Sequence, residues 1–179
     1  QLKRAYKLLK SAKKPLILAG GGVNIARANK QLQEFVEKEN VPVVTTIMGK
    51  GAIPTTHPLY IGNCGMHGKY AANIAVTECD ELFSIGTRFN DRITGDLNEF
   101  APHAKIVHID VDTASISRNV VVDVPVVSDA KTALEKLIEW AEPKKTEKWL
   151  EQIRQWDEEN PLAMCRDRGL SPQMIMEHI

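Results

Sequence analysis

The pattern of apolar and polar positions predicts a strand, a turn and a helix near the start of the chain. Leu16 to Ala19 is an unbroken apolar run, which is typical of a strand buried in a parallel sheet. Three glycines follow, and from Ala28 to Val36 apolar residues then recur three and four positions apart. Lysine, glutamine and glutamate lie between them, so we expect an amphipathic helix that ends near Asn40.

The rest of the chain continues this alternation. Because strands and helices alternate, the strands should form a parallel sheet with helices on both faces. The sequence therefore predicts an α/β fold, with a doubly wound, Rossmann-like parallel sheet of five or six strands flanked by helices. Further strands are expected at Val41–Thr46, Glu81–Ile85, Lys105–Ile109 and the second half of Val120–Val127, and further helices at Leu2–Leu9, Tyr70–Cys79, Ala130–Ala141 and Thr146–Asn160.

The predicted elements divide the chain into three parts. Residues 1–142 hold all of the strands and form the expected α/β domain. Residues 143–170 are expected to be a helical linker, because Pro143 breaks the preceding helix. The pair Ser171–Pro172 has the residue types of a helix start. We therefore expect residues 171–179 to begin a further domain, and the chain to be a piece of a longer polypeptide.

The charge balance argues against nucleic acid and anionic membranes as partners, and the cysteines indicate the compartment. The chain has 23 basic and 23 acidic residues, so it lacks the positive surface with which proteins bind nucleic acid or an anionic membrane. No apolar run reaches the roughly 18 residues of a membrane-spanning helix. Cys64, Cys79 and Cys165 stand far apart in the sequence, which suits a reducing compartment. We expect a cytoplasmic protein, or one that resides in an organelle.

The glycines Gly20 to Gly22 connect the first strand to the helix and allow two interpretations. Glycine lets the phosphates of a ligand approach backbone N–H groups at a helix start, but it serves a tight turn equally well. The usual dinucleotide fingerprint is absent, because Ile25 stands at the position of its third glycine. The second strand ends in Thr45-Thr46 instead of a ribose-binding acid. A standard NAD dehydrogenase is therefore not expected.

Candidate ligand groups gather at the carboxyl ends of the strands, where open α/β sheets bind their ligands. Arg88 and Arg92 lie four residues apart in a polar loop. Each can grip a phosphate or a carboxylate, or can pair with acids of its own loop. Asp110 and Asp112 follow the fourth strand and can bind hydroxyl groups or cap a helix. The arrangement suits a long ligand with a diphosphate in its middle and a ribose towards one end.

No metal site and no set of catalytic nucleophile and base is recognisable. The five histidines show no ligand spacing, and none stands near a cysteine in a known pattern. His67 can contact a cofactor or make local hydrogen bonds only. Met48 and Met66 can pack against a flat ring, although core packing is the commoner use of methionine.

Five segments, taken in chain order, form a recognisable set: Pro15–Gly22, Thr46–Gly51, Gly65–Gly68, Gly86–Gly95 and Ala104–Asp112. The set resembles the central domain of the large subunits of acetolactate synthases (acetohydroxyacid synthases), which are thiamine-diphosphate enzymes. The likeness runs from about Pro15 to Ala141. It implies a DHS-like NAD/FAD-binding fold that holds FAD in an extended form, with no redox role for the flavin.

The resemblance also implies an activity for the whole enzyme. With thiamine diphosphate and Mg²⁺, such an enzyme decarboxylates pyruvate and joins the two-carbon fragment to pyruvate or 2-oxobutyrate, in branched-chain amino-acid synthesis. The Gly-Asp-Gly motif that binds thiamine diphosphate does not occur in this chain. This piece is therefore expected to bind FAD and to be inactive alone, with no catalytic or metal-binding residue. The implied partners are the N- and C-terminal domains, further copies in a dimer or tetramer, and a regulatory small subunit.

The FAD-binding residues that the resemblance implies fall into groups along the cofactor. Those facing the diphosphate and ribityl region are Gly20, Gly21, Gly22 and Arg88; those at the flavin are Thr46, Ile47, Met48, Gly65, Met66 and His67; those at the adenosine are Asp110, Val111 and Asp129. Gly86, Asn90 and Arg92 complete the set, and Arg92 with Asp91 also resembles positions at a substrate channel.

Two positions depart from the family pattern, and two other readings of the chain stay open. Asn90 stands where many members have aspartate, and Ser128 where many have glycine. The first alternative is a related domain that has lost its cofactor and serves as a docking scaffold. The second is a sirtuin-like, NAD-consuming enzyme, against which the missing zinc-binding cysteines and catalytic histidine context argue.

Overall fold

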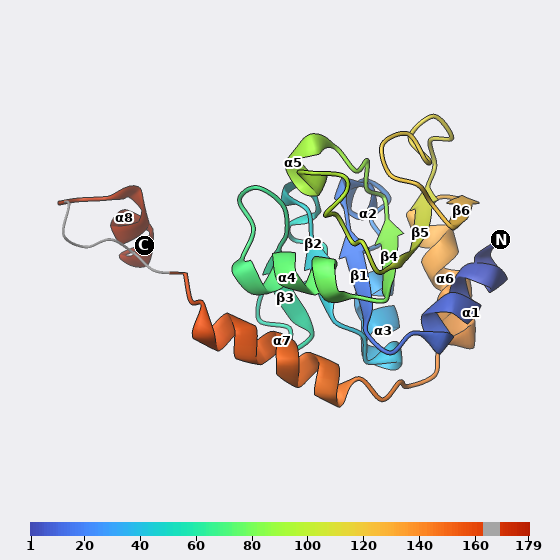
Figure 1. Ribbon diagram of the computed structural model, residues 1–179, viewed down its shortest axis with the longest axis horizontal. Helices are drawn as coiled ribbons and strands as arrows, with labels where there is room; N and C mark the ends of the chain where they lie inside the picture. The colour runs from blue at the N-terminus through green and yellow to red at the C-terminus, as the bar shows by residue number, and fades with distance from the viewer. Residues whose placement is uncertain (163–168) are drawn as a thin grey trace.

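The computed structural model describes residues 1–162 and 169–179, and within them the chain forms one open sheet of six parallel strands (Figure 1). The strands lie in the order β3-β2-β1-β4-β5-β6. The sheet therefore grows in one direction from β1 to β3 and in the other from β4 to β6, which confirms the predicted doubly wound architecture. The strands are β1 (Pro15–Ala19), β2 (Val43–Thr45), β3 (Tyr60–Asn63), β4 (Glu81–Ile85), β5 (Lys105–Asp110) and β6 (Val124–Val127).

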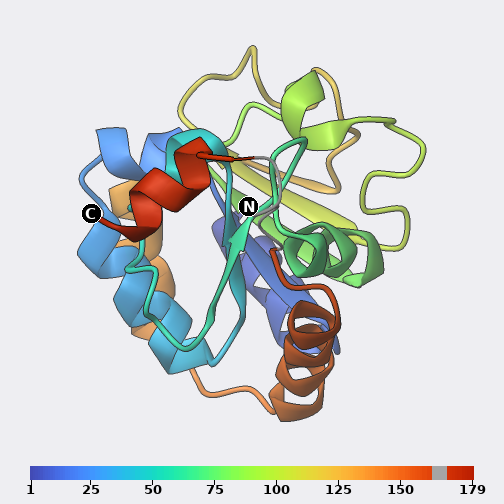
Figure 2. The ribbon, with the colours of Figure 1, turned by 90° about the vertical axis from the view of Figure 1, so that its left-hand side faces the viewer.

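Helices cover both faces of the sheet, as Figure 2 shows. One face carries α1 (Leu2–Ser11), α3 (Asn29–Glu39) and α6 (Ala130–Trp140), and the other carries α4 (Tyr70–Glu78) and α7 (Glu147–Glu159). Three short helical turns follow strands at their carboxyl ends: α2 (Gly21–Ile25) after β1, η1 (Ile47–Gly49) after β2 and α5 (Asp91–Thr94) after β4.

The core consists of two apolar clusters, one on each face of the sheet. Along β1, Ile17 and Ala19 belong to the cluster under α3 and α6, while Leu16 and Leu18 belong to the cluster under α4 and α7. All four side chains are fully buried. Successive side chains of a strand point to opposite faces, so a strand covered on both faces needs apolar residues at every position. This requirement explains the unbroken apolar run that marks the strand in the sequence.

Two local features differ from the sequence prediction. The segment Ile47–Lys69 was expected to be irregular, but Tyr60–Asn63 pairs with β2 as an edge strand. Its four residues include a glycine and an asparagine, so neither length nor composition marks them as a strand. A short helix that the sequence did not predict, α2, follows the glycine turn and ends at Ile25; Arg27 has a positive φ of 52°, and the predicted amphipathic helix begins at Asn29, one residue after its expected start.

Helix α7 packs against the α/β unit through an apolar stripe. Trp149 and Ile153 are buried in the cluster beneath α4. The indole N–H of Trp149 donates to the backbone carbonyl of Pro15 over 3.0 Å, and its ring meets that of Trp156 edge to face at 5.7 Å between centroids. The apolar face that the sequence predicted for this helix therefore has its cover in the same unit.

The segment between α6 and α7 is tied to α1 at the edge of the domain. Lys10 Nζ donates to the carbonyl of Glu142 at 2.8 Å, and Lys144 Nζ donates to the carbonyl of Lys10 at 2.8 Å. The buried carboxylate of Glu39 accepts from Tyr6 Oη and from the N–H of Glu142. Residues distant in sequence thereby lie side by side at this edge.

The last helix begins as predicted. In α8 (Pro172–Glu177), Ser171 Oγ accepts from the N–H of Met174 at 3.3 Å, and Pro172 stands at the first helical position. Cys165 and residues 163–168 of the predicted linker lie outside the described residues. Within the described ranges, the helices are too short or too polar to cross a membrane.

Candidate functional site

The glycine turn lies where the strand order reverses, between β1 and β4. The N–H of Gly20 donates to the carbonyl of Ile85 at 2.9 Å, and that of Gly22 donates to the carbonyl of Gly86 at 3.1 Å. A Cβ atom added to Gly22 would lie only 2.7 Å from Cα of Gly86. This close approach of two strand ends requires glycine at positions 20 and 22 before any ligand is considered.

A cavity of about 260 Å³ opens beside this contact, at the carboxyl ends of β1, β4, β5 and β6. In open α/β sheets the crevice at the reversal of strand order is the usual ligand site. The fold therefore brings together residues from four separate stretches of the sequence. Six of the predicted site residues line this cavity, namely Gly22, Gly86, Arg88, Asp110, Val111 and Asp129.

Asp110 and Arg88 are side chains of opposite charge in the lining of this cavity, which also includes Asp112 and Asp129. Asp110 is largely buried, and its Oδ1 accepts from the N–H of Asp112 at 2.8 Å. Its Oδ2 lies 3.8 Å from Nε2 of His108. Arg88 is exposed on the loop after β4. A fixed carboxylate can accept hydrogen bonds from ribose hydroxyls, and a guanidinium can hold a phosphate, so the pair matches the two ends of a nucleotide diphosphate.

Asp129 and Asp112 also accept hydrogen bonds from neighbouring residues of the chain. Asp129 Oδ1 accepts from the N–H of Thr132 at 3.1 Å and so caps the N-terminus of α6. Asp112 accepts from the N–H of Ala114 and from Ser115 Oγ. These hydrogen bonds, the one from Ser115 most, lower the pKa of the Asp112 carboxyl below its usual value. Asp112 therefore caps a turn, because the described segment between β5 and β6 holds no helix, whereas Asp129 caps a helix; both also line the cavity.

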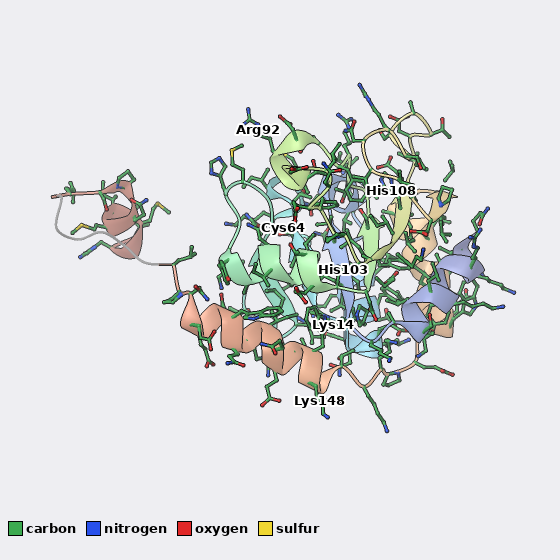
Figure 3. All side chains as sticks on the ribbon, in the orientation of Figure 1. Lys14, Cys64, Arg92, His103, His108 and Lys148 are labelled. Atoms are coloured by element: carbon green, nitrogen blue, oxygen red, sulfur yellow. The ribbon has the colours of Figure 1, made fainter. Side chains whose placement is uncertain are left out.

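A second cavity, of about 410 Å³, lies between the loop after β3, helix α4 and helix α5. Cys64 and Arg92, both labelled in Figure 3, belong to its lining. The N–H of Met66 donates to the carbonyl of Arg92 at 2.8 Å. Arg92 Nη1 lies 3.4 Å from Sδ of Met66. Gly65 is in close contact with the same turn, because an added Cβ would lie 2.5 Å from the carbonyl oxygen of Arg92. Asn90 is the residue that precedes α5.

The loop after β2 presents two apolar side chains beside the glycine turn. Ile47 and Met48 are 60% and 73% exposed, although Thr46 before them is buried. Thr46 Oγ1 accepts from the N–H of Gly49 and so fixes the turn. Met48 also lies against α2, because a Cβ added to Gly21 would be 3.0 Å from its Cβ. An exposed apolar surface of this kind suits contact with a flat ring or with another domain.

His67 lines a third cavity, of about 550 Å³, together with Lys50, Lys69 and residues of α7. Residues 65–67 therefore line two different cavities: Gly65 and Met66 line the second cavity, and His67 lines the third. In the third cavity, Lys69 Nζ forms an ion pair with Asp157 at 2.7 Å.

Neither a metal centre nor a reactive thiol is present in the described part of the chain. Within residues 1–162 and 169–179, no group of three or more histidine, cysteine or acidic side chains is placed to hold a metal ion. Cys64 and Cys79 are buried free thiols. Burial raises the pKa of Cys64 to about 12, which removes the thiolate that reactivity needs.

Sequence reasoning missed one polar cluster next to the first cavity. Ser84, Thr87 and His108 are all buried behind the strand ends that carry the site. His108 stands between Val107 and Ile109 in an otherwise apolar strand. A histidine in such a run was the available signal, because a buried imidazole needs a hydrogen-bond partner.

The strand order and the cavity at its reversal define a Rossmann-like, doubly wound α/β domain. Comparison with protein families assigns the chain to one family. A family described as "Thiamine pyrophosphate enzyme, central domain" matches residues 2–137. Because the match covers more than half of the chain, the chain belongs to this family.

Similar proteins with curated names are acetolactate synthase large subunits. The chain is 47% identical to a probable acetolactate synthase large subunit of Methanocaldococcus jannaschii, over 100% of this chain and 31% of that protein. It is 44% identical to acetolactate synthase isozyme 3 large subunit of Escherichia coli, over 87% of this chain and 27% of that protein. It is 40% identical to the acetolactate synthase large subunit of Haemophilus influenzae, over 100% of this chain and 32% of that protein. The chain thus spans about a third of the length of these relatives.

Proposed function

We propose that this chain is the central domain of an acetolactate synthase large subunit. The identity of 40–47% to three such subunits, over 87–100% of the chain, supports this assignment. The enzyme to which the domain contributes condenses two molecules of pyruvate, or pyruvate with 2-oxobutyrate, with loss of carbon dioxide. Thiamine diphosphate and Mg²⁺, held by other domains, supply the chemistry of that step.

Within the enzyme, the domain binds FAD as a structural cofactor. The observation that supports this role best is the cavity at the strand reversal, which combines a glycine wall with Arg88, Asp110 and Asp129. Asp110 and Asp129 would hold the adenosine end, and Arg88 the diphosphate. The cavity has room for only part of so long a molecule, so the flavin would extend along the exposed surface of Ile47, Met48 and Met66. These residue roles are part of the proposal.

The glycines contribute to this role by shaping the cavity. The N–H groups of Gly20 and Gly22 already donate to backbone carbonyls at the end of β4, and the helix that follows, α2, has only five residues. A helix N-terminus contributes about 0.3–1 kcal/mol to a favourable anion contact. Cofactor affinity would therefore depend on the Arg88 loop and the remote loops more than on the glycine turn.

The proposed partners follow from the same assignment. The domain packs with the N- and C-terminal domains of the same polypeptide. The large subunit forms a homo-oligomer and binds a regulatory small subunit, in the cytoplasm. The exposed apolar residues beside the glycine turn support a surface that another domain or the cofactor covers.

The alternative of a cofactor-free scaffold requires a filled pocket between the glycine turn and Arg88. The open cavity argues against it. Equilibrium dialysis of the chain against FAD, read by flavin absorbance, tests the proposal, with Arg118→Ala as a control for a surface arginine outside the cavity lining. Saturable binding that Arg88→Ala weakens and Arg118→Ala leaves unchanged supports it. Absence of retained flavin at saturating concentration would favour the scaffold.

A further inference from the structure

A buried histidine lies directly behind the loop that carries Arg88 (Figure 3). His108, on β5, is fully buried, and its Nε2 lies 2.6 Å from the backbone carbonyl oxygen of Thr87. The ring of Phe89 meets its imidazole edge to face, with 4.8 Å between centroids. His108 therefore contacts the residue before Arg88 and the residue after it.

The hydrogen bond to Thr87 fixes the tautomer of this imidazole. A carbonyl oxygen can only accept, so Nε2 of His108 must carry the proton. Nδ1 is then an acceptor, buried without a partner among the described residues. Ser84 is its neighbour in the register of β4 and β5, and Ser84 Oγ is likewise buried and unpartnered there. Burial lowers the pKa of His108, which favours the neutral ring.

Arg88 is held between two anchored carbonyl groups. His108 binds the carbonyl of Thr87, and Asn119 Nδ2 donates to the carbonyl of Phe89 at 2.9 Å. Phe89 has a positive φ of 47° and is 2% exposed. A buried aromatic residue in this backbone region persists only where its surroundings enforce it. Arg88, between these two buried residues, is exposed and lines the cavity at the strand reversal.

We propose that His108 is a positioning residue for nucleotide binding: its Nε2–H holds the carbonyl of Thr87 and thereby directs Arg88 into the cavity at the strand reversal. His108 itself touches no ligand in this arrangement and acts through the loop. The predicted effect of His108 on nucleotide affinity rests on the proposed FAD site. The hydrogen bond by which His108 positions the loop does not depend on any cofactor.

Two substitutions separate the hydrogen bond from the packing. His108→Phe keeps an aromatic ring against Phe89 and removes the donor, whereas His108→Gln keeps an N–H donor at a similar distance from the backbone. His103→Phe is the matched control, since His103 is exposed and precedes β5. The first readout is amide hydrogen exchange of Gly86 and Ile93 in the chain without nucleotide, because their N–H groups donate to the carbonyls of Ile109 and Asn90 at the two ends of the loop. Exchange should be about tenfold faster in His108→Phe, as expected when a buried carbonyl loses its donor, and within about threefold of the parent in the other two.

The second readout couples His108 to Arg88 through FAD affinity. His108→Phe should weaken binding about tenfold in the parent chain, and should have no further effect in an Arg88→Ala background, since the two residues act as one unit. His108→Gln should restore most of the affinity. Equal effects of His108→Phe in both backgrounds would mean that the histidine acts through stability or through Asp110, which lies 3.8 Å from its Nε2, and not through Arg88; this result would overturn the proposal.

The two readouts also separate failure of this proposal from failure of the proposed cofactor. If the parent chain binds no FAD while His108→Phe accelerates loop exchange and His108→Gln does not, the FAD assignment fails and the hold on the loop stands. If His108→Phe does not fold, the ¹⁵N shifts of the His108 ring in the parent chain decide. A proton on Nε2 at pH 7 supports the proposal, and an Nδ1–H tautomer, whose Nε2 cannot donate to the Thr87 carbonyl, overturns it.

Discussion

Gly22 donates its backbone N–H to the carbonyl of Gly86 at 3.1 Å, across the line where the sheet changes direction. Each glycine occupies the space that a side chain on the other would need: a Cβ on Gly86 would lie 2.6 Å from Cα of Gly22. The contact joins the end of β1 to the end of β4 and forms one wall of the cavity. Packing of the two strand ends and shaping of the site therefore depend on the same pair.

Gly22→Ala should destabilise the chain although alanine favours a helix. Glycine lies in α2 without a positive φ, so helix propensity alone predicts a gain of about 1 kcal/mol. The clash with Gly86 should instead lower the free energy of unfolding by about 2 kcal/mol, as overpacking typically does. Gly21→Ala is the matched control in the same helix, because its Cβ would lie 3.0 Å from Cβ of Met48 and 3.4 Å from the Met48 carbonyl oxygen, a looser approach to backbone than at Gly22. Urea denaturation measures both, and equal stability of the two variants contradicts the contact.

Asp110→Asn should weaken FAD binding and leave the fold intact. The amide keeps an oxygen for the N–H of Asp112, but it replaces a charged acceptor for ribose hydroxyls. The loss is expected to be about 1 kcal/mol, or roughly fivefold in the dissociation constant. Titration of FAD fluorescence gives the constant. Asp123→Asn is the control, since Asp123 binds Ile106 and Lys105 at the other end of β5; it should change stability and not affinity.

Because of Glu81, the free energy of unfolding of the unmodified chain should fall as the pH rises above about 4.5. Burial raises the pKa of this carboxyl well above its usual value, with a smaller contribution from Asp80 that Lys144 opposes. Both carboxyl oxygens lack partners among the described residues. The unfolded chain releases the Glu81 proton first, so the stabilisation is full below pH 4.5 and is lost towards the higher pKa of the folded state.

Glu81→Gln removes this titration. The free energy of unfolding of the parent minus that of the variant should fall as the pH rises above about 4.5, because the pKa of Glu81 is raised in the folded chain, by at most about 1.4 kcal/mol per pH unit. Urea titrations across that range measure it. Glu78→Gln serves as the control, because Glu78 is 43% exposed and pairs with Lys14. Parallel curves for parent and Glu81→Gln would show that the carboxyl is ionised in the folded chain.

Trp149→Phe should loosen α7 from the sheet. The substitution leaves the carbonyl of Pro15 without its indole donor and weakens the edge-to-face contact with Trp156. A loss of about 1–2 kcal/mol is expected. Trypsin cleavage within α7, followed by mass spectrometry, should accelerate severalfold. Trp140→Phe on α6 should leave that rate unchanged; a similar acceleration there would indicate global destabilisation.

The sequence predicted the elements that rest on local periodicity. Glu81–Ile85 forms a strand with the bounds expected, and the helix predicted from Ala28 to Asn40 ends at Asn40 in a left-handed cap. The order of the strands could not be predicted, because periodicity reports which face a residue buries and not which strand lies beside it. The edge strand Tyr60–Asn63 escaped detection for the related reason that its pairing with β2, and not its composition, makes it a strand.

The site was predictable as far as its residues directly follow strands. Asp110 ends β5, and Arg88 and Asp129 lie in the segments after β4 and β6; these residues are far apart in the sequence and line one cavity, because parallel strands end at the same edge of a sheet. Two features required the tertiary structure. His67 lies in a different cavity from Met66, which precedes it, and the partner of His108 is a backbone carbonyl that no side-chain pattern can report.

The tie between α1 and the segment after α6 has a consequence for how such a unit is built into large enzymes. Lys10, Glu142 and Lys144 hold the last turn of α1 and the segment after α6 together at one edge of the domain. A unit whose entry and exit points are neighbours fits between two other domains without forcing them apart. Residues 2–142 are nevertheless not the whole folding unit, because Trp149 and Ile153 of α7 complete the core cluster beneath α4; any transplant into an unrelated host must carry α7 as well.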